Sequence, residues 1–150
     1  MHSNKANTGN IDDKTVQSFG DEWSRFDQSG MSEAEQLKVF KQYFAIFPWD
    51  KLPPNAEGFD MGCGSGRWAC WVAPRVGTLH CIDPSSAIDV ARKQLADHSN
   101  VQFHEASLDS VLFPLESQDF GYSLGVLHHV PDTAAAIRTC VTYLNPGALL

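Results

Sequence analysis

The spacing of hydrophobic and polar positions divides the chain near residue 58. Before it, Ser32 and Glu35 have the spacing of a helix capping box, and apolar residues follow at helical intervals. This pattern predicts a helix that ends at Pro48, followed by an extended connector over FPWDKLPPN. The residues predicted on its buried face are Leu37, Phe40, Phe44 and Phe47.

From residue 58 onward, short apolar runs alternate with helical patterns. The predicted strands cover 58–61, 78–83, 101–106 and 119–127, and the predicted helices cover 66–74, 84–98 and 133–144. Pro84 falls in the first turn of the second of these helices. The residues expected on its inner face are Ala87, Val90, Ala91 and Leu95. Strands that alternate with helices predict an α/β fold with a doubly wound, mostly parallel sheet and helices on both faces.

The same pattern divides the chain into three regions. Residues 1–17 are polar and predict a flexible arm, 18–55 form an N-terminal helical segment with its connector, and 56–150 form the sheet domain. A further strand begins in 144–150, where the sequence stops. Two explanations remain open for the predicted fourth strand, which needs a neighbour. C-terminal strands of a longer protein are missing here, or self-association covers the exposed sheet edge.

Composition is that of an ordinary soluble protein, with 43% hydrophobic residues and a mean hydropathy of -0.24. Eleven basic and 18 acidic residues give a net charge of -7, so general nucleic-acid binding is not expected. We see no signal peptide and no apolar run that spans a membrane. The four cysteines lack metal-site spacing, so we expect reduced thiols, a cytoplasmic protein and no metal site.

The run FDMGCGSGRW follows the first predicted strand and has glycine at 62, 64 and 66. Ligands of open α/β sheets bind beyond the carboxyl ends of the strands. Glycines there let the backbone approach a ligand and leave N–H groups of the next helix free to bind it. The alternative is that this run is only a tight strand-to-helix turn. Dinucleotide-binding loops require Gly or Ala at position 67, where this chain has Arg67, which disfavours an NAD(P)-binding oxidoreductase.

Asp83 comes 21 residues after Gly62, at the end of the second predicted strand. An acid at this place accepts hydrogen bonds from the two hydroxyls of a ribose. The competing interpretation is a solvated acid at a helix start.

Four segments together resemble the class I S-adenosylmethionine-dependent methyltransferases. They are Asp60 with its G-x-G-x-G loop, Asp83, the segment 119–132 that contains LHHVPD, and the turn LNPG at 144–147. The four segments come in the order of that family, from about residue 58 to the end. The resemblance implies a Rossmann-like sheet, S-adenosyl-L-methionine as cofactor and S-adenosyl-L-homocysteine as product. It also implies SN2 methyl transfer to a small-molecule or biosynthetic-intermediate acceptor. A noncatalytic cofactor-binding partner subunit is a further alternative.

The resemblance also implies which residues bind the cofactor. The loop with Asp60, Gly62, Cys63, Gly64 and Gly66 would hold the amino acid end, and Asp83 with Pro84 would lie at the ribose. Ser107 and the Leu108 N–H would face the adenine edge, where Glu105 or Asp109 are alternative partners. Leu124 and Gly125 would lie nearest the methionine portion. Trp23 would belong to an N-terminal lid over the cofactor, or else Phe19, Trp23 and Phe26 dock the N-terminal arm on the core.

His128 and His129 are adjacent, so their side chains point in different directions, and no further ligand at metal spacing accompanies them. The resemblance makes the pair part of a packed turn, with a proton-acceptor role as the alternative. Methyl transfer from a sulfonium depends largely on alignment and exclusion of water, so no catalytic residue is required in this chain. The sequence does not identify the methyl acceptor.

Overall fold

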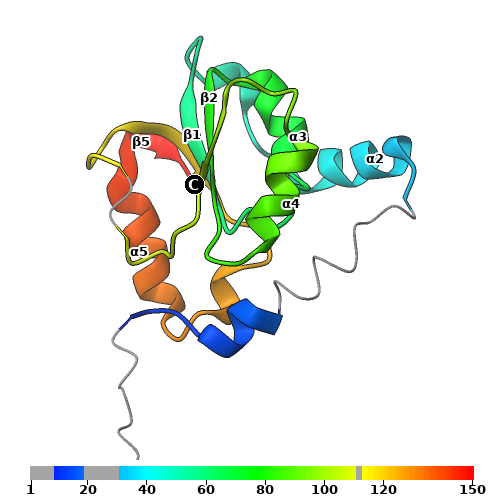
Figure 1. Cartoon of the computed structure of the whole chain (residues 1–150). Helices are drawn as coiled ribbons and strands as arrows, with labels where there is room; N and C mark the ends of the chain where they lie inside the picture. The colour runs from blue at the N-terminus through cyan, green and yellow to red at the C-terminus, as the bar shows by residue number, and fades with distance from the viewer. Residues whose placement is uncertain (1–8, 19–30, 111–112) are drawn as a thin grey trace, which may run out of the picture.

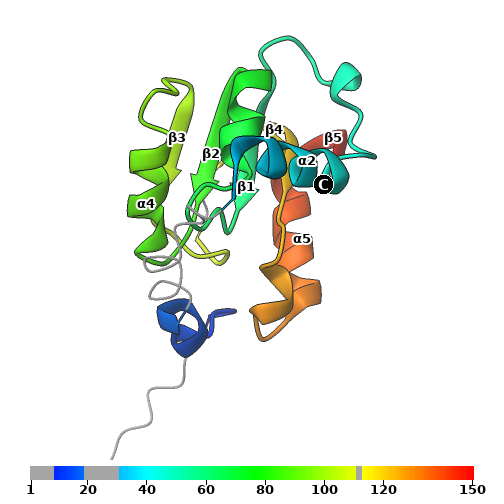
Figure 2. The same cartoon turned by 90° about the vertical axis from the view of Figure 1, so that its right-hand side faces the viewer.

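The computed structural model describes residues 9–18, 31–110 and 113–150. Its five strands form one parallel sheet in the order β3-β2-β1-β4-β5 (Figures 1 and 2). The strands are β1 (Glu57–Met61), β2 (Thr78–Ile82), β3 (Val101–His104), β4 (Gln118–Tyr122) and β5 (Leu144–Leu149). The strand order reverses beside β1, as in doubly wound folds. The predicted Rossmann-like α/β architecture is therefore confirmed.

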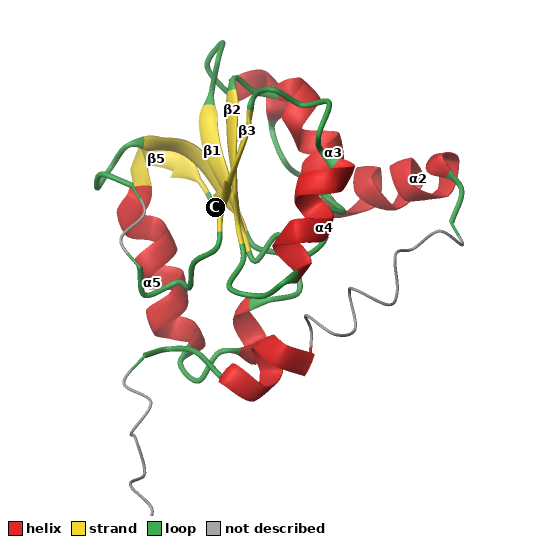
Figure 3. Cartoon of the chain, viewed as in Figure 1, coloured by secondary structure: helices red, strands yellow, loops and turns green. Residues whose placement is uncertain are grey.

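Helices cover both faces of this sheet, as Figures 1 and 3 show. On one face lie α2 (Glu33–Tyr43), α3 (Ala69–Val72), the 3-10 turn η2 (Ala73–Arg75) and α4 (Ala87–Gln94), and their side chains form one buried cluster with the sheet. On the other face lies α5 (Thr133–Tyr143), which packs in a second cluster. No helix in the described ranges is long and apolar enough to cross a bilayer.

Side-chain alternation along the strands explains the two clusters. On β2, Leu79 and Cys81 belong to the cluster with α3 and α4, whereas Ile82 belongs to the cluster with α5. On β1, Phe59 and Met61 also face α5, and both are at most 2% exposed. Both faces of the central strands are thus buried, as expected for a parallel sheet.

Two glycine–phenylalanine pairs join β1 and β4 at adjacent register positions. Gly58 pairs with Phe120 and Phe59 with Gly121. A Cβ added at Gly121 would lie 2.2 Å from the Phe59 ring, and one at Gly58 would lie 2.3 Å from the Phe120 ring. Each ring therefore lies over the glycine of the neighbouring strand, one pair on each face of the sheet.

Several element boundaries differ from those expected. The Ser32–Glu35 capping box is present, but α2 ends at Tyr43 rather than at Pro48, and the connector contains a 3-10 turn, η1 (Trp49–Lys51). Pro84 precedes α4, which begins at Ala87, and within it the fully buried Ile88 was not expected on the inner face.

The carboxyl-terminal boundaries differ as well. β4 stops at Tyr122 rather than near residue 127. The Asn-Pro-Gly turn belongs to β5, which pairs with β4. The fourth strand is therefore covered, and the edges of the described sheet are β3 and β5. Self-association at an edge stays a prediction.

The N-terminal residues 9–18 depart from the expected arm. Residues 13–18 are helical and lie at the end of the sheet toward which the strand arrows of β2 and β3 point (Figure 2). The Asn10 side-chain amide makes two hydrogen bonds to the Asp132 backbone. Its Nδ2 donates to the Asp132 carbonyl at 2.7 Å, and its Oδ1 accepts from the Asp132 N–H at 2.7 Å. The Asn10 N–H also donates to the Asp109 carboxylate. These bonds attach the segment to two loops of the sheet domain.

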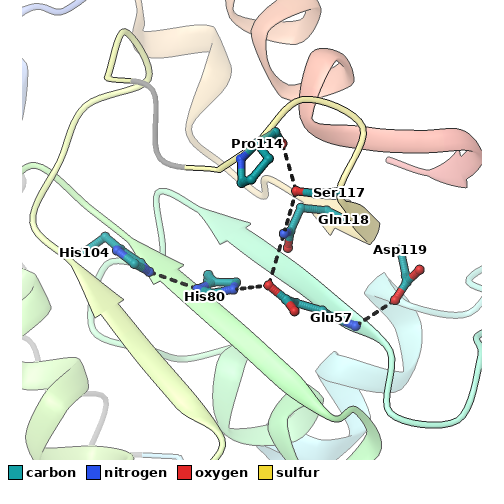
Figure 4. Close-up of polar contacts among 7 residues, drawn as sticks. All are labelled: Glu57, His80, His104, Pro114, Ser117, Gln118 and Asp119. Atoms are coloured by element: carbon teal, nitrogen blue, oxygen red, sulfur yellow. Dashed lines mark hydrogen bonds and ion pairs between the residues drawn. The ribbon is translucent and has the colours of Figure 1, made fainter.

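A polar chain crosses four strands on the α5 face (Figure 4). The buried His80 contacts Glu57 through Nε2 at 2.8 Å and His104 Nε2 through Nδ1 at 2.9 Å. Gln118 donates to the same Glu57 oxygen at 3.2 Å. The hydrogen bond from His80 lowers the pKa of Glu57. Because the carboxylate only accepts, the His80 Nε2 atom carries a proton and donates it to Glu57.

Candidate functional site

A cavity of about 270 Å³ opens at the carboxyl ends of the strands. Its walls come from the loops after β1, β2, β3 and β4 and from the N-terminal segment. Nine of the expected cofactor-binding residues line this one cavity. They are Gly62, Cys63, Gly64, Asp83, Pro84, Ser107, Leu108, Leu124 and Gly125. The structure thus brings together residues that are far apart in the sequence.

The glycine-rich loop needs glycine for steric reasons. Gly62, Gly64 and Gly66 have φ of +80°, +52° and +85°, a region that other residues rarely adopt. A Cβ at Gly62 would lie 2.5 Å from the Val126 side chain, and one at Gly66 would lie 3.0 Å from Leu95, the C-cap of α4. Gly62 therefore lets the β4 loop approach the cavity wall, and Gly66 packs the loop on α4.

Three N–H groups of the glycine-rich loop form hydrogen bonds within the protein. The N–H groups of Gly62 and Cys63 both donate to the Ile82 carbonyl, at 2.8 and 2.9 Å. The Gly66 N–H donates to the Cys63 carbonyl at 2.9 Å. These bonds fix the loop against β2, so its shape is set before any ligand binds.

Asp83 connects the loops that follow β1 and β2. Its Oδ2 accepts from the Gly64 N–H at 2.8 Å, and its Oδ1 accepts from the Ser85 N–H at 2.9 Å and the Ser85 hydroxyl at 2.5 Å. The residue is 8% exposed and lines the cavity. A carboxylate oxygen accepts up to two hydrogen bonds, so Oδ2 keeps capacity for a hydroxyl. Asp83 is thus not a solvated helix-start acid.

The loop after β3 forms the far wall of the cavity. Its strand-side end is held to β2, because the Asp83 N–H donates to the His104 carbonyl at 3.1 Å and the Ala106 N–H donates to the Asp83 carbonyl at 3.3 Å. Ser107 and the buried Leu108 line the cavity as expected. The alternative partners Glu105 and Asp109 are exposed and lie outside the cavity lining.

Asp60 lies behind the glycine loop and does not line the cavity. Its carboxylate is fully buried, and neither oxygen has a hydrogen-bond partner in the described part of the chain. Burial raises the pKa of Asp60 to about 8, the neighbouring Tyr122 hydroxyl opposes this rise without reaching hydrogen-bond geometry, and the Asp83 charge adds to it. Asp60 therefore carries its proton at neutral pH. Gly66 is also outside the lining, and Trp23 lies outside the described residues.

Sequence reasoning missed the N-terminal wall of the cavity. Asn10, Ile11, Asp12, Thr15 and Val16 all line it, although this polar stretch shows no apolar periodicity. Its one local signal is Asp12, whose carboxylate accepts from the Lys14 and Thr15 N–H groups and from the Thr15 hydroxyl. These side-chain bonds begin the short helix.

An aromatic and cationic wall was also missed. Tyr43 from α2 contacts Trp68, with ring centroids 4.7 Å apart, and the Arg67 guanidinium lies 4.5 Å from the centroid of the Trp68 ring. All three residues line the cavity. Arg67 carried a signal in the sequence, since it occupies the position where dinucleotide-binding loops need a small residue.

The two histidines of LHHVPD differ in position. Both belong to the 3-10 turn η3 (Leu127–His129), and their ring centroids are 3.8 Å apart. His129 lines the cavity, whereas His128 does not. Within the described ranges, no group of three or more His, Cys, Asp and Glu side chains has an arrangement that could hold a metal ion.

Comparisons with known proteins agree with this geometry. A family model described as "Methyltransferase domain" matches residues 59–150, which is more than half of the chain. A ubiquinone biosynthesis O-methyltransferase of Pseudomonas fluorescens is 33% identical over 91 residues, covering 59% of this chain and 39% of that protein. The chain thus spans about two fifths of the length of this relative.

Solved structures share the fold. A phosphoethanolamine N-methyltransferase of Haemonchus contortus, in complex with phosphoethanolamine and S-adenosylhomocysteine, matches with a TM-score of 0.68 and 14% identity. The match covers 85% of this chain and 29% of that one. A SAM-dependent methyltransferase from Aquifex aeolicus matches with a TM-score of 0.59 and 16% identity, covering 79% and 71%.

Proposed function

Since this chain belongs to the class I S-adenosylmethionine-dependent methyltransferase family, we propose that its cavity binds S-adenosylmethionine and supports methyl transfer to a small-molecule acceptor. The observation that carries the proposal is the Gly64–Asp83 hydrogen bond. It holds the glycine-rich loop beside Asp83, the acid expected to bind the ribose, at one wall of the cavity. Membership of this family argues against the alternative of an NAD(P)-dependent oxidoreductase.

The residues present suit this cofactor at each part of the cavity. The Asp83 carboxylate keeps acceptor capacity for a ribose hydroxyl. Ile82, Pro84, Ala106 and Leu108 form an apolar wall that suits a flat purine. At the loop after β1, Gly62 and Gly64 line the cavity without side chains, so a ligand can approach their backbone. The loops after β3, β2 and β1 thus suit the adenine, the ribose and the amino acid end, in that order.

The chemistry that the cofactor supplies is a sulfonium methyl group, whose carbon–sulfur bond breaks as an acceptor lone pair forms the new bond to carbon. The protein then has to hold the acceptor in line and exclude water. The residues available for this task lie beyond β4 and in the N-terminal segment. Where the acceptor atom carries a proton, His129 is the candidate base, because it lines the cavity and His128 does not.

The proposed acceptor is a small molecule or a biosynthetic intermediate. Three observations support this class. Several relatives, by their names, act in ubiquinone biosynthesis or on phosphoethanolamine. The net charge of -7 also disfavours a polyanionic acceptor. The Tyr43–Trp68 wall favours an acceptor with a planar or apolar part.

The test is methyl transfer from S-adenosylmethionine carrying an isotopically labelled methyl group. The acceptor panel contains phenols, catechols and amino alcohol phosphates, with RNA and protein as comparison acceptors. We expect label in one chemical class, and a loss of turnover in His129→Gln but not in His128→Gln where the acceptor is a hydroxyl. Cofactor binding without label transfer to any acceptor would instead support the noncatalytic partner subunit. Transfer to RNA or protein alone would overturn the small-molecule proposal.

A further inference from the structure

Arg67 is the only lysine or arginine among the described residues that line the cavity. It directly follows Gly66, and the short α3 begins two residues later. Its backbone is well fixed, because Gly66 packs against Ala91 of α4 and the C-cap Leu95, and the Cys70 thiol donates to the Arg67 carbonyl at 3.0 Å. The side chain therefore starts from a defined place at the glycine loop.

The guanidinium is held by an aromatic ring and not by an acid. It lies 4.5 Å from the centroid of the Trp68 ring, and that ring packs against Tyr43. No ion pair to Arg67 exists within the described ranges. Stacking on an aromatic face leaves the edge of the guanidinium, with its N–H donors, available to an anion.

The acids of the same cavity do not neutralise this charge. The Asp12 carboxylate accepts from the Lys14 and Thr15 N–H groups. The Asp83 carboxylate accepts from Gly64 and Ser85. The described part of the cavity thus has a cation at the β1 loop without an acidic partner, while its two aspartates accept hydrogen bonds from N–H and O–H donors.

We propose that Arg67, stacked on Trp68, binds the α-carboxylate of the cofactor and so selects ligands that carry it. The inference rests on the proposed function, because the amino acid end of S-adenosylmethionine is expected at the glycine loop. A guanidinium and a carboxylate form charge-assisted, often bidentate hydrogen bonds. Trp68 is the positioning residue, since its ring fixes where the guanidinium lies.

The experiment compares two ligands by calorimetry: S-adenosylhomocysteine and its decarboxylated form, which lacks only the carboxylate. Wild type, Arg67→Gln and Arg67→Lys are titrated with both. The matched control is Arg75→Gln, because Arg75 also lies on aromatic rings, 5.0 Å from the Phe40 ring and 5.6 Å from the Trp49 ring, but outside the cavity. The two ligands and the two proteins, wild type and Arg67→Gln, form a thermodynamic cycle that isolates the interaction between Arg67 and the carboxylate.

We expect Arg67→Gln to weaken the binding of S-adenosylhomocysteine by about 10-fold or more and to leave the affinity for the decarboxylated ligand unchanged. Arg67→Lys should retain part of the preference, because it keeps the charge but loses the bidentate geometry. Arg75→Gln should keep the full preference. Thermal unfolding of each variant checks that it is folded.

Two negative results are distinguishable. In the first, wild type binds both ligands, and Arg67→Gln either lowers the two affinities equally or changes neither. The assignment of Arg67 to the carboxylate is then wrong, while the proposed cofactor stands. If folded wild-type protein binds neither ligand, the proposed function is wrong and the assignment falls with it.

Discussion

The Asp83 carboxylate accepts a 2.8 Å hydrogen bond from the Gly64 N–H and thereby joins the loop after β2 to the loop after β1. These residues are 19 positions apart in the sequence. Because the Gly62 and Cys63 N–H groups also donate to β2, the cavity wall is one connected unit. Changes to its glycines should therefore affect ligand binding and stability together.

Gly62→Ala should destabilise the fold more than Gly147→Ala. Both glycines have positive φ, +80° and +85°, so both substitutions carry a similar backbone strain of about 1–2 kcal/mol. At Gly62 the new Cβ also lies 2.5 Å from Val126, whereas at Gly147 it meets nothing within 4 Å. Urea unfolding should show an additional loss of about 1–3 kcal/mol at Gly62. Equal losses in the two variants would contradict the close contact with the β4 loop.

Gly121→Ala should be destabilising by about 1–3 kcal/mol, because its Cβ would lie 2.2 Å from the buried Phe59 ring. The double variant with Phe59→Leu should lose less stability than the sum of the two single changes. Denaturant unfolding of all four proteins measures this coupling. Additive losses would show that the ring does not lie over the glycine.

The stability of the protein should fall as pH drops below about 6.5 because of His104. Burial lowers the pKa of His104 below its ordinary 6.5, and the His80 and Arg92 charges act in the same direction. Around the His80–His104 pair, Glu57 contacts His80, Gln118 donates to Glu57, and the Phe113 ring contacts both imidazoles. Between the two pKa values the unfolded chain takes up a proton that the folded chain resists, so acid favours unfolding.

The variant for this test is His104→Gln, whose amide can hydrogen-bond to His80 as donor or acceptor but does not titrate. The melting temperature of wild type should decrease from about pH 7.5 to about pH 5.5 more than that of the variant. His98→Gln is the control, because its ring lies outside the polar chain. A wild-type decrease that persists unchanged in His104→Gln would assign the effect to other groups.

Asp60 should give the opposite pH dependence. Because burial raises the pKa of Asp60 from 3.8 to about 8, the folded chain keeps a proton that the unfolded chain releases above about pH 4. This residue therefore lowers stability as pH rises from about 4 to about 8. In Asp60→Asn that component should disappear, so the difference in unfolding free energy between variant and wild type grows with pH. A constant difference would mean that Asp60 is ionised in the folded protein.

The fold was predictable because its signals are local. Alternating strand and helix patterns predicted four strands and the start of β5, and the Ser32–Glu35 capping box marked the beginning of α2. Nine residues that the family resemblance implied for cofactor binding line one cavity, because the loops that follow neighbouring parallel strands meet at the same end of the sheet. Strand ends were less predictable, since β4 stops at Tyr122 where the backbone turns toward Gly125, whose φ is +75°.

The features that the sequence did not indicate depend on contacts between residues that are far apart in the chain. The Asn10–Asp132 bonds join positions 122 apart, and no pattern in the polar N-terminal stretch indicates them. The pairing of Phe59 with Gly121 needs the strand register, which the sequence does not specify. The partners of Asp83 and the burial of Asp60 likewise follow from three-dimensional packing.

The central claim is that this cavity binds the methyl donor through Asp83, and calorimetric titration with S-adenosylhomocysteine tests it most directly. The account predicts one site per chain for wild type and at least about 10-fold weaker binding for Asp83→Asn, since a charged acceptor is lost. The exposed acid Asp89 supplies the control, and Asp89→Asn should bind like wild type. The absence of binding to folded wild-type protein, or equal binding by Asp83→Asn, would contradict the claim.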